Sequence, residues 1–160
     1  MGFNTDCGGV ALTADIKVSN KATTWNTRLS QIGRTDVELI IVSFSLGDMD
    51  YIEKILSKRP TGRNITLICN TNYYRNAQIL KNHLPEMRVF VQPKAHAKLV
   101  LYEPETVWIS SENIGHKVKS FDATVGIKNR QVYDHYHSQV ESLLRSRDTF
   151  EIEEENRYGE

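Results

Sequence analysis

The chain has 160 residues, of which 39% are hydrophobic and 25% charged, a composition typical of one globular domain with its own hydrophobic core. Lysine and arginine together number 20, as do aspartate and glutamate, which excludes the strongly basic balance of many nucleic-acid-binding proteins. The longest apolar run, residues 39–42, is too short to cross a membrane, and residues 1–10 lack the pattern of a signal peptide, so we expect no membrane segment and a cytoplasmic location.

The charges are unevenly distributed. Four of the 20 acidic residues lie within residues 151–155, so we expect a folded domain over residues 1–150 and an acidic, flexible tail over residues 151–160. The rest of the chain is mildly basic, which allows a local basic face that contacts phosphate. Cys7 and Cys69 form no C-x-x-C pair, which argues against a zinc site. Reduced cysteines are the simpler interpretation, with one disulfide as the alternative.

The first part of the chain predicts alternating strands and helices. A candidate edge strand at residues 10–18 and a short helix at residues 22–32 come first. Apolar, β-branched runs then predict buried strands at residues 38–45, 64–69 and 87–91. Asp48 can cap a helix that ends near Lys58, before Pro60. A second helix, residues 74–84, has its apolar residues on or near one face: Ala77, Ile79, Leu80 and Leu84.

A hairpin, a strand and a long helix follow. Residues 97–102 and 106–110 flank the turn at Glu103-Pro104-Glu105, which is typical of a β-hairpin. Residues 123–127 predict another strand. The last helix, residues 131–145, has an apolar stripe made by Val132, Tyr136, Val140, Leu143 and Leu144. Together the elements predict an α/β fold in which helices flank a mixed β-sheet.

The polar residues with chemical potential gather around the hairpin. His96 and Lys98 are two positions apart, so on a strand they project to the same face. If residues 106–110 return antiparallel, the loop that holds Ser111 and Asn113 emerges at the same end. An imidazole, an ammonium, a hydroxyl and an amide are poor ligands for calcium or magnesium, but they suit an anionic tetrahedral group. We therefore expect a phosphate site without a metal.

These residues carry a resemblance to a known family. His96-x-Lys98, with Glu103 five residues after the lysine and Ser111-x-Asn113 further on, resembles the HKD signature of the phospholipase D superfamily. The order of strands over residues 25–145 is similar to that of its single-motif bacterial endonucleases. Two positions depart from the family pattern. Glu103 replaces the usual aspartate, which bears on stability or geometry, and Ser110 replaces a glycine in the phosphate loop.

The resemblance implies a metal-independent and cofactor-free phosphodiesterase. In it His96 is the nucleophile, Lys98, Asn113 and Ser111 hold the phosphate, and an acidic residue orients the histidine, a position that Asp122 matches. Because the chain has one motif, the second histidine of the family's site is expected from a second copy in a homodimer. The short single-motif members are nucleases, so the resemblance favours nucleic acid as substrate, with DNA ahead of RNA.

Other interpretations stay open. His116 follows the phosphate loop and is either a substrate contact or a plain loop residue. Tyr73 and Arg75 either stack on a base and hold a phosphate or pack at a helix start. The whole chain is alternatively a module that binds nucleic acid without turnover, or a phosphodiesterase for phospholipids or small nucleotides.

Overall fold

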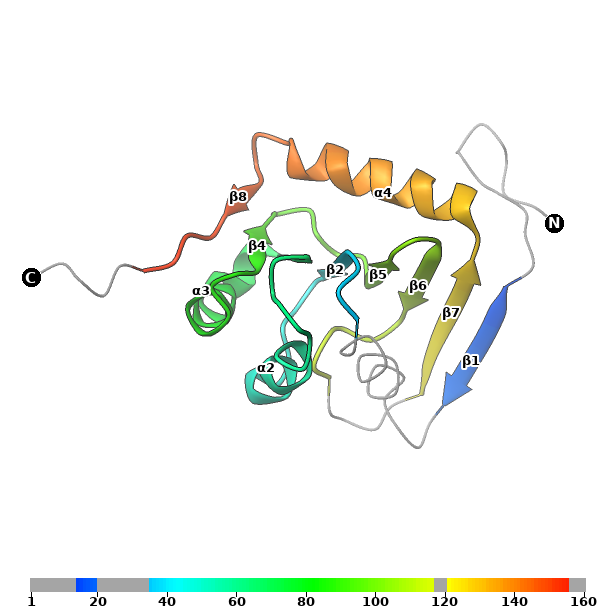
Figure 1. Ribbon diagram of the computed structural model, residues 1–160, viewed down its shortest axis with the longest axis horizontal. Helices are drawn as coiled ribbons and strands as arrows, with labels where there is room; N and C mark the ends of the chain where they lie inside the picture. Colours follow the sequence, from blue (N-terminus) through cyan, green and yellow to red (C-terminus); the bar gives the residue numbers. More distant parts are fainter. Residues whose placement is uncertain (1–13, 20–34, 117–120, 156–160) are drawn as a thin grey trace, which may run out of the picture.

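The computed structural model describes residues 14–19, 35–116 and 121–155. Within them, eight strands form one mixed sheet in the order β1-β7-β6-β5-β2-β3-β4-β8 (Figure 1). The strands are β1 (Asp15–Ser19), β2 (Leu39–Ser43), β3 (Ile65–Cys69), β4 (Arg88–Val91), β5 (Leu99–Tyr102), β6 (Thr106–Ser110), β7 (Asp122–Lys128) and β8 (Phe150–Glu151). The described helices are α2 (Met49–Leu56), the short 3-10 helix η2 (Thr71–Tyr73), α3 (Tyr74–His83) and α4 (Arg130–Leu144).

Helices cover both faces of the sheet (Figure 1). On one face, Leu39 and Ile41 of β2 belong to a core that includes residues of α2 and α3. On the other face, Ile40 and Val42 belong to a second core with residues of α4. Strand β2 is therefore buried on both sides, which explains why its sequence is a continuous apolar run without polar alternation. In the described part of the chain, no helix is long and apolar enough to cross a membrane.

The strand directions bring several chain segments together at one edge. Strands β2, β3 and β4 run parallel, so their carboxyl ends lie side by side. Strand β5 runs antiparallel to β2, with Leu99 opposite Val42, so the residues before β5 lie beside the residues after β2. Helix α2 starts at this edge, where the side chain of Asp48 caps it by accepting a hydrogen bond from the Tyr51 amide at 2.7 Å. We call this the carboxyl edge.

The predicted α/β fold with a mixed, helix-flanked sheet is confirmed, and the elements differ from expectation in detail. Strand β5 starts at Leu99, although the Lys98 carbonyl still accepts a hydrogen bond from the Ser110 amide at 2.9 Å. Ile79 was expected on the buried face of α3 but is 44% exposed, because the helix buries only Ala77 and Leu80. The helix expected over residues 22–32 lies outside the described residues.

The start of the expected tail is part of the sheet. Strand β8 pairs antiparallel with β4, and the Ile152 amide donates to the Val89 carbonyl at 2.8 Å. The Ile152 side chain is only 2% exposed and belongs to the core under α2 and α3. A single apolar residue within an acidic run gave a weak signal, but its burial ties residues 150–152 to the folded domain.

Two glycines allow two loops to touch at the carboxyl edge. The Gly47 amide donates to the Ile114 carbonyl at 2.9 Å, and the Asp48 amide donates to the Gly115 carbonyl at 3.0 Å. A Cβ on Gly47 would lie 2.4 Å from the Gly115 oxygen. Gly115 has φ +76°, and a Cβ there would lie 2.8 Å from the Ile52 side chain. Any larger residue would push these loops apart.

We expect Gly115→Ala to lower the free energy of unfolding by roughly 2 kcal/mol, because alanine is strained at positive φ and also collides with Ile52. Urea unfolding measures the change. Gly62→Ala is the matched control, since its Cβ would meet its nearest neighbour, the Glu86 side chain, at 3.2 Å. An equal loss in both variants would contradict the special role of Gly115.

Candidate phosphate site at the carboxyl edge

His96 is exposed and sits in the loop between β4 and β5. The buried side chain of Asn70, at the end of β3, donates to the carbonyls of Pro93 at 3.0 Å and Ala95 at 3.1 Å. These bonds hold the backbone immediately before His96. The sequence did not single out Asn70, although a polar residue that directly follows a buried strand marks the end where a loop begins.

An aromatic ring lies against the imidazole. The Phe44 ring lies 5.2 Å from the His96 ring, tilted by 47°. Tyr73 packs edge-on against Phe44 as well, with 5.6 Å between the ring centroids. Tyr73 is half-buried in this contact, which agrees with the helix-start packing alternative for this residue. Arg75, in the first turn of α3, is exposed.

Asn113 joins the phosphate loop to the end of β2. Its Oδ1 accepts hydrogen bonds from the Phe44 amide at 3.0 Å and the Ser45 amide at 3.1 Å, and it lies 3.2 Å from the Ser43 hydroxyl. Because backbone amides can only donate, these two bonds fix which end of the side-chain amide is the oxygen. The Nδ2 group is then the donor that Asn113 can offer to an anion.

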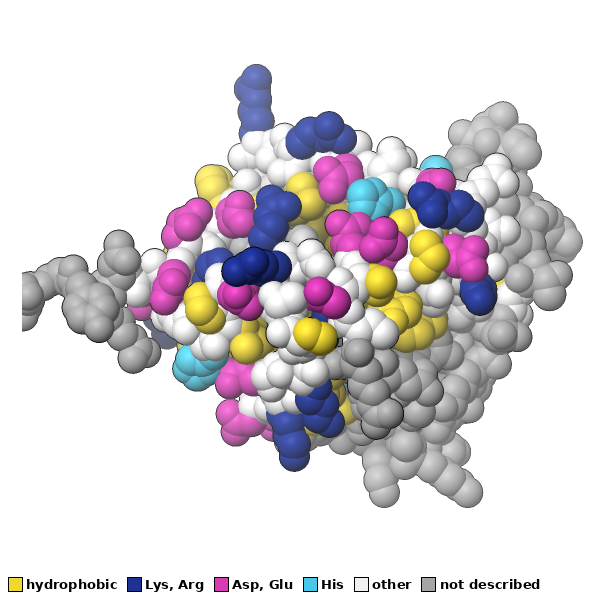
Figure 2. Space-filling model, in the orientation of Figure 1, with side chains coloured by type: hydrophobic (Ala, Val, Ile, Leu, Met, Phe, Trp, Pro, Cys, Tyr) yellow, Lys and Arg dark blue, Asp and Glu magenta, His cyan; other side chains and the backbone are white. Residues whose placement is uncertain are grey.

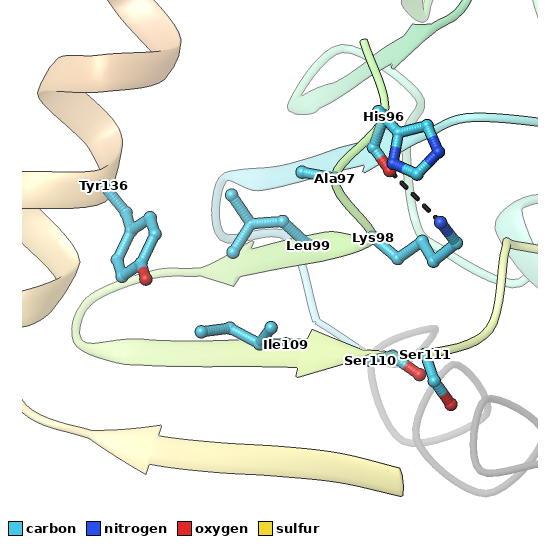
Figure 3. A pocket seen from close by; sticks show the side chains of 8 residues that line it. All are labelled: His96, Ala97, Lys98, Leu99, Ile109, Ser110, Ser111 and Tyr136. Carbon is cyan, nitrogen blue, oxygen red and sulfur yellow. Dashed lines mark hydrogen bonds between the residues drawn. The ribbon is translucent and has the colours of Figure 1, made fainter. Parts of the chain in front are cut away.

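Lys98 and the serines line one cavity with His96. The cavity has a volume of about 350 Å³ and is lined by His96, Ala97, Lys98, Leu99, Ile109, Ser110, Ser111 and Tyr136 (Figure 3). The Lys98 ammonium donates to the carbonyl oxygen of His96 at 3.2 Å, which keeps it close to the imidazole (Figure 3). The structure therefore brings together the histidine, the lysine and both serines of the expected set.

Asp122 orients the serine hydroxyl. The Ser111 hydroxyl donates to Asp122 Oδ1 at 2.8 Å and accepts from the Ala123 amide at 3.1 Å. Asp122 is 8% exposed, so this contact lies largely outside water. The Ser110 hydroxyl, in turn, accepts from the Glu112 amide at 3.1 Å and lies 3.2 Å from the Thr124 hydroxyl. Ser110 therefore shapes the phosphate loop from within.

A group of potential metal ligands lies beside the phosphate loop. Glu112, His116 and Asp122 each place a ligand atom within 4.8 Å of the others, and both carboxylates are buried. The expectation of a site without metal rested on His96, Lys98, Ser111 and Asn113, and spacing along the sequence did not indicate this group. His116 therefore lies against the acidic residues that shape the loop.

Glu103 lies at the opposite end of β5 from His96. Its Oε2 accepts a hydrogen bond from the Glu38 amide at 3.1 Å, and its own amide donates to the Glu38 carbonyl at 3.1 Å. Glu38 in turn accepts from His137 at 2.8 Å and from Tyr133 at 3.4 Å on α4. Burial and the neighbouring Glu38 and Glu103 raise the pKa of Tyr133, so its hydroxyl stays a donor. Glu103 thus joins β5, β2 and α4 away from the cavity.

Charge on the described surface is mixed rather than uniformly basic. On the face shown in Figure 2, lysine and arginine side chains lie among acidic ones without forming a single stripe. A long basic track for a nucleic-acid backbone is therefore absent from the described part of this face. Charge recognition at the site depends on a few local groups.

No protein-family model and no curated protein matches this chain. Among solved structures, it is similar to Nuc, a phospholipase D family member from Salmonella typhimurium, with a TM-score of 0.69 and 12% identity over 88% of this chain and 98% of Nuc. The chain has a phospholipase D-like fold.

Two further solved structures share this fold. Phosphatidylserine synthase from Haemophilus influenzae matches with a TM-score of 0.62 and 11% identity, over 95% of this chain and 43% of the synthase. TrmBL2, an archaeal chromatin protein with a novel mode of DNA binding, matches with a TM-score of 0.56 and 12% identity, over 79% of this chain and 50% of TrmBL2. At such identities the likeness shows the phospholipase D-like fold and leaves the reaction to be argued from the site.

We expect Glu103→Ala to lower the free energy of unfolding by about 0.5–1 kcal/mol, the usual contribution of one hydrogen bond at a partly exposed position, without weakening phosphate binding. Lys98→Ala should weaken phosphate binding and leave the free energy of unfolding nearly unchanged, because the Lys98 ammonium lies in the cavity. Urea unfolding measures stability, and titration with inorganic phosphate followed by the NMR signals of the histidines measures binding. Weaker phosphate binding in folded Glu103→Ala would contradict this separation.

Proposed function

We propose that this chain is a metal-independent phosphodiesterase that cleaves DNA through a phosphohistidine intermediate, at a site shared by two copies of the chain. The observation that carries the proposal is the exposed imidazole of His96, which lines one cavity with Lys98 and Ser111 at the carboxyl edge of a phospholipase D-like fold. A nucleophile beside a cation suits attack on a phosphodiester.

The reaction runs in two displacements. A ring nitrogen of His96 attacks phosphorus in line while the bond from phosphorus to the leaving oxygen breaks, and a second histidine gives that oxygen a proton. The second histidine then removes a proton from water, which attacks the phosphohistidine and releases His96. Lysine and neutral donors stabilise the charge on the nonbridging oxygens, as a metal ion does in other phosphoryl-transfer enzymes.

Two groups in this mechanism are held by contacts away from the phosphate. The end of β2 holds the Asn113 oxygen, which leaves Nδ2 for the phosphate. Phe44 supports the His96 ring. Groups fixed before the substrate arrives need little reorganisation during the reaction, which is the main source of electrostatic stabilisation in such sites.

The second histidine is proposed to be His96 of a second copy. Of the five histidines in the chain, His83 contacts Glu53 at 2.6 Å and His137 contacts Glu38 at 2.8 Å, both away from the cavity. His135 is exposed on α4. His116 lies against Glu112 and Asp122 and is the rival donor within one chain. The second copy brings its own lysine and asparagine, whereas His116 brings none.

DNA is the proposed substrate class because the residue pattern resembles single-motif endonucleases. Two neighbours by fold keep two other functions in view. TrmBL2 binds DNA, so a module that binds without turnover is the first alternative. The likeness to a phosphatidylserine synthase keeps a phospholipid phosphodiesterase as the second. Incubation with plasmid DNA separates turnover from binding, and incubation with phospholipid vesicles tests the second alternative.

We expect cleavage of plasmid DNA to persist in EDTA, because His96 supplies the nucleophile and Lys98 and Asn113 stabilise the anion in the proposed mechanism, without a metal ion. His96→Ala should abolish cleavage with the fold intact, and Lys98→Ala and Asn113→Ala should each lower kcat by about a hundredfold or more. Gel assays and circular dichroism measure both properties. Glu112→Gln is the control for the group of potential metal ligands formed by Glu112, His116 and Asp122. It removes one carboxylate of that group and leaves His96 unchanged, so cleavage should persist. Loss of activity in EDTA that magnesium restores would refute the mechanism.

Mixing chains tests whether two copies share a site. With random pairing of wild-type and His96→Ala chains, activity should fall with the square of the wild-type fraction, because every mixed pair lacks one required histidine. Sedimentation should show a dimer at assay concentration. If His116 supplies the proton instead, activity should fall linearly with the wild-type fraction, and His116→Ala should be as inactive as His96→Ala.

A further inference from the structure

The cavity beside His96 has a second half that the proposed chemistry does not use. Its polar half holds His96, Lys98 and the two serines. Its other half is formed by Leu99 of β5, Ile109 of β6 and Tyr136 of α4, with Ala97 between the two halves (Figure 3). Leu99 and Ile109 lie directly opposite each other on neighbouring strands, so they form a flat apolar floor.

Tyr136 forms the wall that faces this floor. It projects from α4 toward the Leu99 and Ile109 side chains (Figure 3). Its ring is only partly buried against the core beneath α4. A half-exposed aromatic ring above an apolar floor suits a flat, apolar group, and the hydroxyl of tyrosine adds a polar tip. The position of Tyr136 in the apolar stripe of α4 gave no sign of this, because the stripe alone predicted a core residue.

We propose that this apolar half is a subsite for one nucleobase, the base attached next to the scissile phosphate, and that Tyr136 is the residue that recognises it. The proposal rests on the phosphodiesterase function argued above. A phosphate held by His96 and Lys98 places its neighbouring nucleoside within the same cavity, so the two halves bind two connected parts of one substrate.

The size and chemistry of the cavity favour a base over a lipid chain. Its volume of about 350 Å³ is at the lower end of the range for small-molecule sites, which fits one nucleoside and its phosphate. An aromatic ring interacts with the face of any base, so stacking would give affinity with little sequence preference.

Three chromogenic diesters test the subsite: thymidine 5′-(p-nitrophenyl phosphate), methyl p-nitrophenyl phosphate and hexyl p-nitrophenyl phosphate. They share the leaving group and differ in the other ester group, which is a nucleoside, a methyl group or an alkyl chain. For the wild-type protein we expect kcat/KM for the thymidine ester to exceed that for the methyl ester by roughly tenfold, the usual contribution of stacking one base. The hexyl ester should fall well below the thymidine ester.

Substitutions at Tyr136 separate stacking from packing. Tyr136→Ala should bring the ratio of the thymidine to the methyl ester close to one, and Tyr136→Leu should do the same while keeping apolar volume in the core. Tyr136→Phe should preserve the ratio, since it keeps the ring. Phe150→Ala is the matched control, because Phe150 is an exposed aromatic residue on β8, outside the cavity. It should leave the ratio unchanged.

The possible failures are distinguishable. If the wild-type protein hydrolyses none of the three esters, the phosphodiesterase function itself fails. Suppose it hydrolyses them, but the ratio of kcat/KM for the thymidine ester to that for the methyl ester is unchanged in Tyr136→Ala, or both rates fall equally in Tyr136→Leu. Then only the subsite is overturned. A hexyl ester hydrolysed as well as the thymidine ester would replace the base subsite with a general apolar one, of the kind a lipid substrate needs.

Discussion

The geometry of the site depends on the side-chain oxygen of Asn113. It accepts hydrogen bonds from the Phe44 and Ser45 amides, in the segment that ends β2, and lies beside the Ser43 hydroxyl. This one atom ties the phosphate loop after β6 to the strand that lies at the centre of the sheet. Phe44, whose amide is one of the donors, carries the ring that supports His96. The proposed nucleophile and the proposed phosphate donor are thus linked through a single residue. A shift of the phosphate loop would therefore move Phe44 and change the position of the His96 ring.

The two ends of strand β5 have different roles, because the proposed catalytic residues lie at its start and a structural contact lies at its end. At its start, His96 and Lys98 reach the cavity. At its end, Glu103 bonds to the Glu38 amide, and Glu38 bonds to His137 of α4. The short motif therefore spans both ends of one strand, and its acidic member acts on the fold about one strand length away from the imidazole. This explains why glutamate is acceptable at position 103, since the longer side chain only has to reach a backbone amide at the sheet margin.

The sequence was sufficient to predict the fold where one physical signal dominated. The doubly buried strand β2 and the capped helix α2 followed from an apolar run and from Asp48. Strand β8 was missed because its two residues are both exposed and carry no alternation, and it is held by backbone pairing with β4 and by Ile152. Periodicity placed Ile79 on the buried face of α3. The helix buries only Ala77 and Leu80, and Ile79 is exposed.

The same limit applies to the site. His96, Lys98 and the serines could be grouped from their spacing at the adjoining ends of two paired strands, because register between adjacent strands is local information. Phe44, Asn70 and Tyr136 could not, because each reaches the site from an element distant in the sequence. Asn70 contacts Ala95 only because β3 and β4 are parallel neighbours, and Tyr136 meets Ile109 only because α4 crosses the sheet. Such contacts require the tertiary arrangement rather than the pattern of any one segment.

The charges around the cavity bear on the proposed pairing of two copies. Lys98 is the one cationic side chain among the described residues that line it, whereas Glu112 of the phosphate loop and Asp122 at the start of β7 are buried carboxylates. Asp122 holds the Ser111 hydroxyl, but the field of both carboxylates opposes an anion. A phosphodiester gains further negative charge on its oxygens as it is attacked. One lysine neutralises only part of that charge. A second copy facing the first across a two-fold axis would bring a second lysine and a second asparagine to the same phosphate. In the proposed dimer the second copy would therefore supply charge as well as a proton donor, and an isolated chain would bind phosphate weakly even with every residue of its own half in place.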